Sequence, residues 1–154
     1  AIARAKADSL RYPYTAADVH FMQGMIAHHA QAIKMAGWAP SNGESSSVRT
    51  LCERIINAQQ DEIVTMQTWL ADRHQVVPPA TAAPMKMMVN GKEQEMLMPG
   101  MLTEAQMHRL DGAKGEEFDR LFLTFMIQHH RGAVSMVQDL FDTDGAAQDD
   151  LTRK

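Results

Sequence analysis

The chain has 154 residues, a formal net charge of −4 and 45% hydrophobic residues, which predicts a single domain over residues 1–154 with a core of its own. The slight acidity argues against a nucleic-acid-binding protein, which would carry a basic face, and no apolar run is long enough to span a membrane. Cys52 is the only cysteine, so an intramolecular disulfide and a thiolate cluster are excluded. Methionine is abundant, with 13 residues.

The first predicted element is a helix that begins at Thr15 or Asp18, either of which could serve as N-cap, and ends near Gly37. A polar loop, SNGESSS, follows it. A second helix is predicted over residues 48–74, because hydrophobic residues recur there at helical spacing. These residues are Ile55, Ile56, Ile63, Met66, Trp69 and Leu70.

A connector of different composition occupies residues 75–112. Three prolines in QVVPPATAAP end the second helix, and a methionine-rich segment runs from there to Met107. Thr103 is predicted to cap a short helix that ends at about Leu110. A long last helix is predicted over roughly residues 116–141, and the polar sequence DTDGAAQDDLTRK follows it.

The strongest signal is an internal repeat with a constant offset of 101 residues. It predicts a duplicated helix–loop–helix unit, with the first copy at about 15–74 and the second at about 115–154. By this offset a fourth helix should start near residue 147, which leaves room for only about two turns. We expect either a fragment or a bundle that a second copy of the chain completes. The matched residues are Asp18, Phe21, Met25, Ile26, His28, His29, Ala32 and Met35 with Asp119, Phe122, Met126, Ile127, His129, His130, Ala133 and Met136.

Each repeated helix carries two adjacent histidines, which point about 100° apart on a helix. The helical pattern predicts His29 in the middle of the inward-facing arc, and the repeat predicts the same for His130. Four imidazoles would then meet inside the bundle, where each ring N–H needs a partner. A metal ion is one solution. The alternative is that the histidines are ordinary core residues and the methionines core filler.

The donor types favour copper. Imidazole suits Zn, Cu, Fe and Ni, whereas thioether narrows the choice to soft ions, above all Cu(I). Thioether needs no deprotonation and persists where exposed thiols oxidise, so the pattern fits copper handling in an oxidising compartment. The candidate ligands on the repeated helices are His28, His29, His129, His130, Met22, Met25, Met126, His20, Met35 and Met136.

Two further groups are candidates. His20 and Met22 have leucines at the matching positions of the second copy, so packing does not require them, although His20 could equally be a surface residue. On the second helix Glu62 lies on one face with Met66, and it could be a ligand, an acceptor for a ring N–H or an exposed ion-pair partner. Asp18 and Asp119 could turn inward or cap their helices.

The connector offers a second methionine cluster, with six methionines within 17 residues. Prolines and glycines flank it, so it does not resemble the apolar stripe of a helix. It could wrap Cu(I) or Ag(I), or it could be a hydrophobic strap that covers the bundle. The six residues are Met85, Met87, Met88, Met96, Met98 and Met101.

Four motifs together cover nearly the whole chain. They are D-x-x-F-M-x-x-M-I-x-H-H-x-x-A at 18–32, Q-x-x-E-I-x-x-M-x-x-W-L at 59–70, PGMLTEAQM at 99–107 and G-x-x-F-D-R-L-F-L-x-x-M-I-x-H-H-x-G-A at 115–133. In these motifs the chain resembles the domain of unknown function 305 family. The resemblance implies a ferritin-like helical bundle that is exported to the periplasm or cell exterior. For several members it also implies copper binding and copper or silver tolerance through Met and His.

We therefore predict an all-α, ferritin-like bundle that is a periplasmic or secreted copper-binding protein and not an enzyme. Its role would be metal buffering, transfer or resistance, with Cu(I) favoured and Zn or Fe as other candidates. The first alternative is a ferritin-like di-metal oxidase, but such sites use several carboxylates and Glu-x-x-His pairs, and the chain has no Glu-x-x-His. The second alternative is a structural or partner-binding module. The predicted partners are a metal ion and a second copy of the chain.

Overall fold

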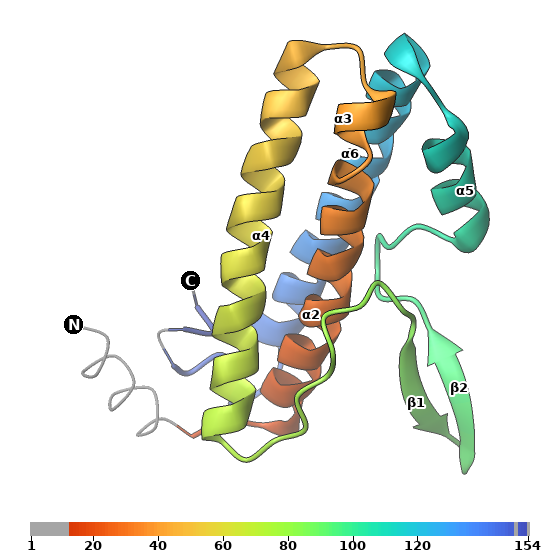
Figure 1. Cartoon of the computed structure of the whole chain (residues 1–154). Coiled ribbons are helices and arrows are strands. Elements are labelled where there is room, and N and C mark those ends of the chain that lie inside the picture. Colours follow the sequence, from red (N-terminus) through yellow and green to blue (C-terminus); the bar gives the residue numbers. More distant parts are fainter. Residues whose placement is uncertain (1–12, 150, 154) are drawn as a thin grey trace.

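Three long helices form the body of the computed structural model, which describes residues 13–149 and 151–153 (Figure 1). For residues 85–89, 93 and 94 the description covers the backbone only. The helices are α2 (Ala16–Ala36), α4 (Ser46–Asp72) and α6 (Gly115–Phe141). Helix α2 packs against both of the others and runs in the opposite direction to them. The all-α bundle predicted from the sequence is confirmed.

Helix α2 begins after a capping box. The Thr15 hydroxyl accepts a hydrogen bond from the Asp18 N–H at 3.3 Å, and the Asp18 carboxylate accepts one from the Thr15 N–H at 2.8 Å. Two of the free N–H groups at the helix start are thereby satisfied. Thr15 is thus the N-cap, and Asp18 is the third residue of the helix. After Gly37 the chain forms one further short helix, α3 (Ala39–Asn42), which the sequence did not predict.

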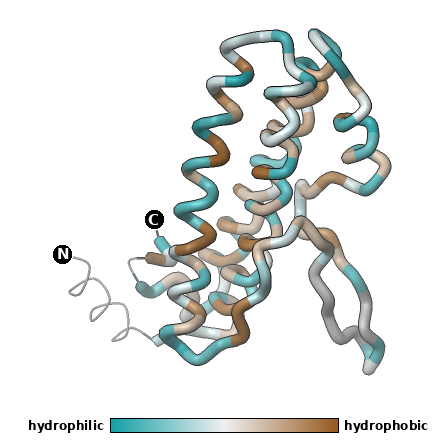
Figure 2. Tube along the Cα trace, viewed as in Figure 1, coloured by the Kyte–Doolittle hydropathy of each residue, from teal (hydrophilic) through white to brown (hydrophobic). Residues whose placement is uncertain are grey.

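The later helices begin close to their predicted starts. Helix α4 starts two residues before the predicted Val48, because Ser45 serves as N-cap and its hydroxyl accepts from the Val48 N–H. The short helix α5 (Glu104–Gly112) has Thr103 as N-cap, as predicted, in a capping box with Gln106. Figure 2 shows hydrophilic and hydrophobic positions alternating along α4, as an amphipathic helix requires.

The methionine-rich connector contains a β-hairpin, which the sequence analysis did not predict. Strands β1 (Met85–Val89) and β2 (Lys92–Met96) pair antiparallel. They are joined by Asn90 and Gly91, which both have positive φ, at 52° and 75°. Asn-Gly between two short segments is the signal of a two-residue hairpin, and it was present in the sequence. The hairpin projects from the side of the bundle (Figure 1).

The core has a larger cluster near α3 and α5 and a smaller one near the other end of the bundle. The larger cluster joins residues of α2, α4, α5 and α6 around Phe118 and Phe122. The smaller cluster contains Trp69, Leu70 and Ile26 together with four buried methionines. Those methionines are Met22, Met25, Met66 and Met136.

Asp149 fastens the residues after α6 to the end of α4. Its Oδ2 atom accepts hydrogen bonds from Trp69 Nε1 at 2.8 Å and from Arg73 Nη2 at 2.9 Å, and its Oδ1 atom accepts from the Thr152 N–H at 2.8 Å. The described residues after 147, where a fourth helix was expected, form turns.

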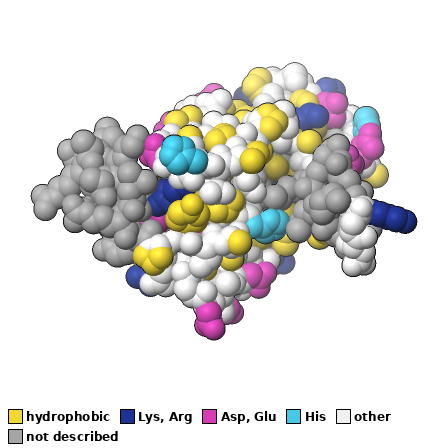
Figure 3. All heavy atoms as spheres, turned by 90° about the horizontal axis from the view of Figure 1, so that it is seen from below, with side chains coloured by type: hydrophobic (Ala, Val, Ile, Leu, Met, Phe, Trp, Pro, Cys, Tyr) yellow, Lys and Arg dark blue, Asp and Glu magenta, His cyan; other side chains and the backbone are white. Residues whose placement is uncertain are grey.

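Seen from below, this end of the molecule exposes hydrophobic side chains near its middle (Figure 3); Phe141 is 50% exposed. No helix among the described residues is long and apolar enough to cross a membrane.

Candidate metal-binding cleft

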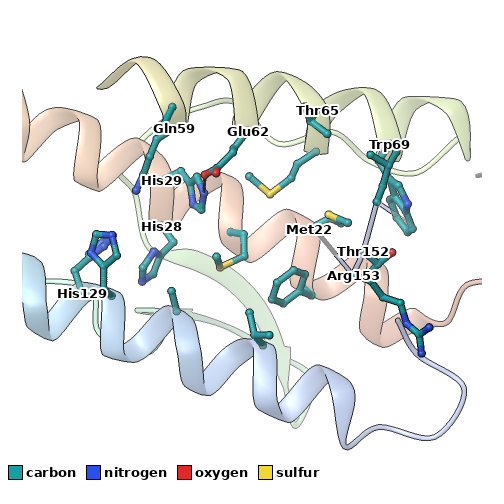
Figure 4. A pocket seen from close by; sticks show the side chains of 18 of the residues that line it. Met22, His28, His29, Gln59, Glu62, Thr65, Trp69, His129, Thr152 and Arg153 are labelled. Carbon is teal, nitrogen blue, oxygen red and sulfur yellow. Dashed lines mark hydrogen bonds and ion pairs between the residues drawn. The ribbon is translucent and has the colours of Figure 1, made fainter. Parts of the chain in front are cut away.

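A cleft of about 740 Å³ opens between α2, α4 and α6 (Figure 4). One end lies at the histidines of α2 and α6, and the other end lies at Trp69 and the residues after α6. Its walls are mostly apolar, with a few polar groups. Among the described residues that line the cleft, Glu62 is the one acidic residue. The lining includes Met22, Met25, His28, His29, Gln59, Glu62, Thr65, Met66, Trp69, His129, His130, Val137, Phe141, Leu151, Thr152 and Arg153.

His28 and His129 meet at the inner end of the cleft. Each is 1% exposed, and their ring centroids are 3.6 Å apart with the planes inclined by 35°. His28 Nε2 lies 3.1 Å from the carbonyl oxygen of Pro99, which can only accept, so this nitrogen carries the proton. Pro99 belongs to residues 97–102, which cross α2 and α6 and are called the strap below.

His29 turns toward α4. It is 8% exposed, and its Nε2 atom lies 2.6 Å from Glu62 Oε2, as Figure 4 shows. Its other ring nitrogen, Nδ1, is buried and has no hydrogen-bond partner among the described residues. Glu62 therefore acts as an acceptor for a ring N–H, one of the three roles considered from the sequence.

His130 corrects the prediction from the repeat. It was expected in the middle of the inward arc, as the counterpart of His29, but its side chain is exposed at the rim of the cleft. The buried histidine of α6 is His129. Helix α4 covers His29 on α2, whereas no described helix covers the matching face of α6, where Ile127 is 54% exposed. Burial of the second histidine pair thus follows the neighbouring helices and not the repeat.

Burial keeps the inner histidines neutral. Desolvation, with a contribution from His29, lowers the pKa of His28 to about 4. Desolvation and the nearby His28 lower the pKa of His129 to about 2. Desolvation also lowers the pKa of His29, against the opposing effect of Glu62. Neutral imidazole is the form that binds metal ions, and two buried ring nitrogens, His29 Nδ1 and His129 Nε2, have no partner among the described residues.

Three of the predicted methionine ligands line the cleft, and the others on the bundle helices do not. Met22, Met25 and Met66 are on its wall. Met35 and Met126 pack in the larger core cluster, and Met136 packs in the smaller one, so these three act as core residues. His20 is half-buried and is not among the lining residues.

The connector methionines with described side chains, Met96, Met98 and Met101, are not gathered into one cluster. Met101 is buried and Met96 is 45% exposed. Met98 packs over Gly24, where its Sδ atom lies 3.3 Å from the place that a Cβ would take. The strap thus covers part of the bundle, which is the alternative that the sequence left open. The side chains of Met85, Met87 and Met88 lie outside the described residues.

The two repeated aspartates hold loops and are not among the cleft-lining residues. Asp18 Oδ1 accepts from the Ala147 N–H at 2.7 Å, and Asp119 Oδ2 accepts from the Ser45 N–H at 2.7 Å. Each residue therefore fixes the loop that follows the other repeated helix. This arrangement removes the two inward carboxylates that the di-metal alternative required.

Sequence reasoning missed the polar residues at the far end of the cleft. Thr152 and Arg153 reach it because Asp149 bonds to Trp69, a contact 80 residues apart in the chain. No local pattern could have indicated that contact. Gln59, which lies one turn before Glu62 on α4, has an Oε1 atom that is buried without a partner among the described residues.

Among the described residues, no group of three or more His, Cys, Asp or Glu could hold a metal ion. A site built only from these hard or intermediate donors is therefore absent from this part of the chain. The donors that line the cleft are instead imidazole nitrogens and thioether sulfurs, which are the ligands that soft ions prefer. The residues present fit a soft ion better than a carboxylate-bound di-metal pair.

Comparison with known proteins decides the family. The model of the family named Domain of unknown function (DUF305) matches residues 18–152. The chain belongs to the DUF305 family. The DUF305 match is supported by a crystal structure of a candidate secreted DUF305 protein from Streptomyces coelicolor, with TM-score 0.69 and 27% identity over 89% of this chain and 78% of that one. A DUF305 fragment from Deinococcus radiodurans has TM-score 0.69 and 30% identity, with coverage of 85% and 80%.

A third similar structure was determined with a metal. It is CopM in its Cu(II)-bound form, with TM-score 0.59 and 30% identity over 82% of this chain and 77% of CopM. An uncharacterized protein of Acanthamoeba polyphaga mimivirus is 36% identical over 56 residues. That match covers 36% of this chain and 37% of the length of the viral protein.

Proposed function

We propose that this DUF305 protein binds copper as Cu(I) in the cleft and acts outside the cytoplasm, in the periplasm or as a secreted protein, in metal buffering, transfer or resistance. One observation carries the proposal. Two buried imidazole nitrogens without partners, His29 Nδ1 and His129 Nε2, belong to a cleft that methionine thioethers also line. Burying polar atoms without partners is costly, and a bound ion would remove that cost. The similarity to CopM, whose structure holds Cu(II), supports copper as the metal, while the choice of Cu(I) rests on the thioether donors.

The residues that would hold the ion are His29 and His129, with thioethers from Met22, Met25 and Met66. Their rings are kept neutral by burial, so binding requires no proton release near neutral pH. Thioether sulfur is soft and uncharged, which favours Cu(I) over Zn(II) and Fe(II). No step of catalysis is needed for this role.

The first test is an anaerobic titration of purified protein with Cu(I) against a competing chelator, with Zn(II) and Fe(II) in parallel. The variant with both His29→Ala and His129→Ala should lose Cu(I) affinity by at least about tenfold. The matched control changes two exposed histidines outside the cleft, His108→Ala and His74→Asn, where Asn tolerates the positive φ of 55°. Equal affinity of the two double variants would contradict the proposed site, and binding of Zn(II) or Fe(II) alone would favour a different metal.

A second test separates thioether ligation from packing. Met25→Leu keeps the volume of a cleft-lining side chain but removes its sulfur. We expect weaker Cu(I) binding with little change in any Zn(II) binding. Met35→Leu is the control, because Met35 is fully buried in the larger core cluster. If both substitutions leave Cu(I) affinity unchanged, the methionines of the cleft are core residues only.

A further inference from the structure

The two histidines at matching positions of the repeat differ in what holds their rings. His29 is 8% exposed, and its Nε2 atom lies 2.6 Å from Glu62 Oε2, on the neighbouring helix. His130 is exposed, and its Nδ1 atom lies 2.9 Å from the carbonyl oxygen of Met126, on its own helix. His29 Nδ1 has no hydrogen-bond partner of normal geometry among the described residues, although the Met25 backbone acts on the ring, where it opposes the lowering of the pKa by desolvation.

These partners decide which nitrogen of each ring is free to bind an ion. A carboxylate and a peptide carbonyl can only accept, so the proton lies on His29 Nε2 and on His130 Nδ1. The lone pairs are then on His29 Nδ1, which is buried, and on His130 Nε2, which belongs to a side chain at the exposed rim of the same cleft. One histidine thus offers its donor atom inside the protein and the other offers it where an incoming molecule can reach.

The two supports also differ in strength. A carboxylate that accepts from the far side of an imidazole fixes the ring and raises the donor strength of the opposite nitrogen. The charge-assisted bond from His29 to Glu62 is short, at 2.6 Å, although the Glu62 side chain is 59% exposed. His130 has only a neutral carbonyl one turn back along α6, and its exposure leaves the ring room to move when that bond breaks.

We infer that the two histidines have separate tasks at the proposed site, on which this inference rests. His29, positioned by Glu62, anchors the ion and sets the affinity. His130 is the exchange ligand through which the ion enters and leaves. The ion passes from the buried ligands to His130 Nε2, an incoming soft donor (a thiolate or thioether of a small molecule or protein) bonds to it there, and the bond to His130 Nε2 then breaks. The ion stays Cu(I) throughout, and no proton or electron is transferred.

An anchoring ligand sets the Cu(I) affinity and an exchange ligand sets the transfer rate, so both quantities are measured on each variant. Affinity is obtained by competition with a Cu(I) chelator, and the transfer rate is obtained by stopped-flow mixing of the loaded protein with an excess of that chelator. His130→Ala should slow transfer by about tenfold or more while affinity changes by less than about threefold. Glu62→Gln should lower affinity by about tenfold to a hundredfold. The matched controls are His108→Ala and Asp61→Asn, which change exposed residues outside the cleft.

A spectroscopic readout tests the positioning role of Glu62 without metal. Two-bond ¹H–¹⁵N correlation spectra of the metal-free protein should show His29 protonated at Nε2 and His130 at Nδ1. Glu62→Gln should weaken the Nε2–H preference of His29 and leave His130 unchanged. A merely structural role of Glu62 would alter stability without changing this tautomer.

The outcomes distinguish this inference from the proposed function. If the natural protein does not compete for Cu(I), the proposed function fails and the inference fails with it. If the protein binds Cu(I) but His130→Ala lowers affinity without slowing transfer, only the division of tasks is overturned. The same holds if His29 carries its proton on Nδ1. Slow transfer with intact affinity in His130→Ala, together with the two expected tautomers, supports it.

Discussion

Helices α2 and α6 carry the same MI-x-HH sequence, but their surroundings differ. On α2 both histidines are buried, because α4 covers one side of the helix and α6 and the strap cover others. On α6 only His129 is buried, and Ile127 and Val134 beside His130 are 54% and 57% exposed. The same motif thus gives two buried histidines on α2, whereas on α6 it gives one buried histidine and one at the exposed rim of the cleft. The difference shows that a helical pattern limits which faces are apolar, while the neighbouring helices decide which of them are buried.

The strap meets the two repeated helices in different ways. On α2 the side chain of Gln31 exchanges two hydrogen bonds with the backbone of Leu102, at 3.0 and 2.7 Å. At the matching position of α6 stands Gly132, and the backbone of Pro99 and Gly100 lies directly against it. Helix α2 therefore holds the strap by side-chain hydrogen bonds, and α6 holds it by close backbone contact and one long hydrogen bond, from Gln128 Nε2 to the Gly100 carbonyl at 3.4 Å. Three substitution or pH experiments can test how far these differences between the helices matter.

The largest expected effect is acid destabilisation of the metal-free protein through the stacked pair His28 and His129. Their pKa values, about 4 and about 2, lie below the value of 6.5 expected for an unfolded chain. Between pH 6.5 and 4 the unfolded chain therefore binds more protons, and stability falls as the pH falls. From pH 7 to pH 5 we expect a loss of about 2 kcal/mol for each histidine, about 4 kcal/mol together.

Denaturant unfolding at both pH values measures this loss. His129→Gln should remove about 2 kcal/mol of this loss, because it removes one of the two stacked histidines. His108→Ala, which changes an exposed histidine, should retain all of it. Equal stability of the natural protein at pH 7 and pH 5 would show that the pair is not held neutral.

The fold could be predicted from the sequence where local chemistry fixes it. Thr15 and Thr103 indicate where two helices begin, because their hydroxyls accept hydrogen bonds from free N–H groups of the first turn. The long helices are indicated by apolar residues that recur at helical spacing. The hairpin was not predicted although Asn90 and Gly91 indicate its turn, because its strands, MKMMV and KEQEM, contain few of the β-branched and aromatic residues that are typical of strands. Long-range contacts left no local signal.

The candidate site was predicted only in part for the same reason. His28, His29 and His129 were identified because adjacent histidines on apolar helices need partners. The exposure of His130 depends on which helix lies beside α6, and the packing of Met35 and Met126 in the larger core depends on how the helices are rotated about their axes. Neither is encoded in residue spacing alone.

The second expected effect concerns Gly132. A Cβ there would lie 2.0 Å from the Pro99 carbonyl oxygen and 2.4 Å from Gly100 Cα, so the strap would have to move. Gly132→Ala should lower the free energy of unfolding by about 3 kcal/mol. It should also lengthen the contact from Pro99 to His28, which chemical shifts of the His28 ring would report.

Gly112→Ala is the matched control, because a Cβ at Gly112 meets no atom within 4 Å. It should leave stability unchanged or raise it by up to about 1 kcal/mol, as helical Gly-to-Ala changes do. Equal effects of the two substitutions would mean that the strap adapts freely. The hydrogen bonds of Gln31 on α2 would then hold it without help from the close contact at Gly132.

The smallest effects should come from the repeated aspartates. Asp18 accepts three hydrogen bonds, two from Thr15 and one from the Ala147 N–H. Asp119 accepts one, from the Ser45 N–H, and its Oδ1 atom has no partner among the described residues. Asp18→Ala should cost about 2 kcal/mol of unfolding free energy and Asp119→Ala about 1 kcal/mol.

Guanidinium unfolding of both variants, with the exposed Asp61→Ala as control, checks this order. Each aspartate fixes the loop that follows the opposite helix, so its loss should also raise amide hydrogen exchange there, at Ala147 for Asp18→Ala and at Ser45 for Asp119→Ala. Exchange that rises only next to the substituted residue would contradict this cross-connection. If Asp119→Ala proves the more costly, its buried Oδ1 atom is not the weakness that the hydrogen bonds indicate, and the second repeated helix is fixed at its start as firmly as the first.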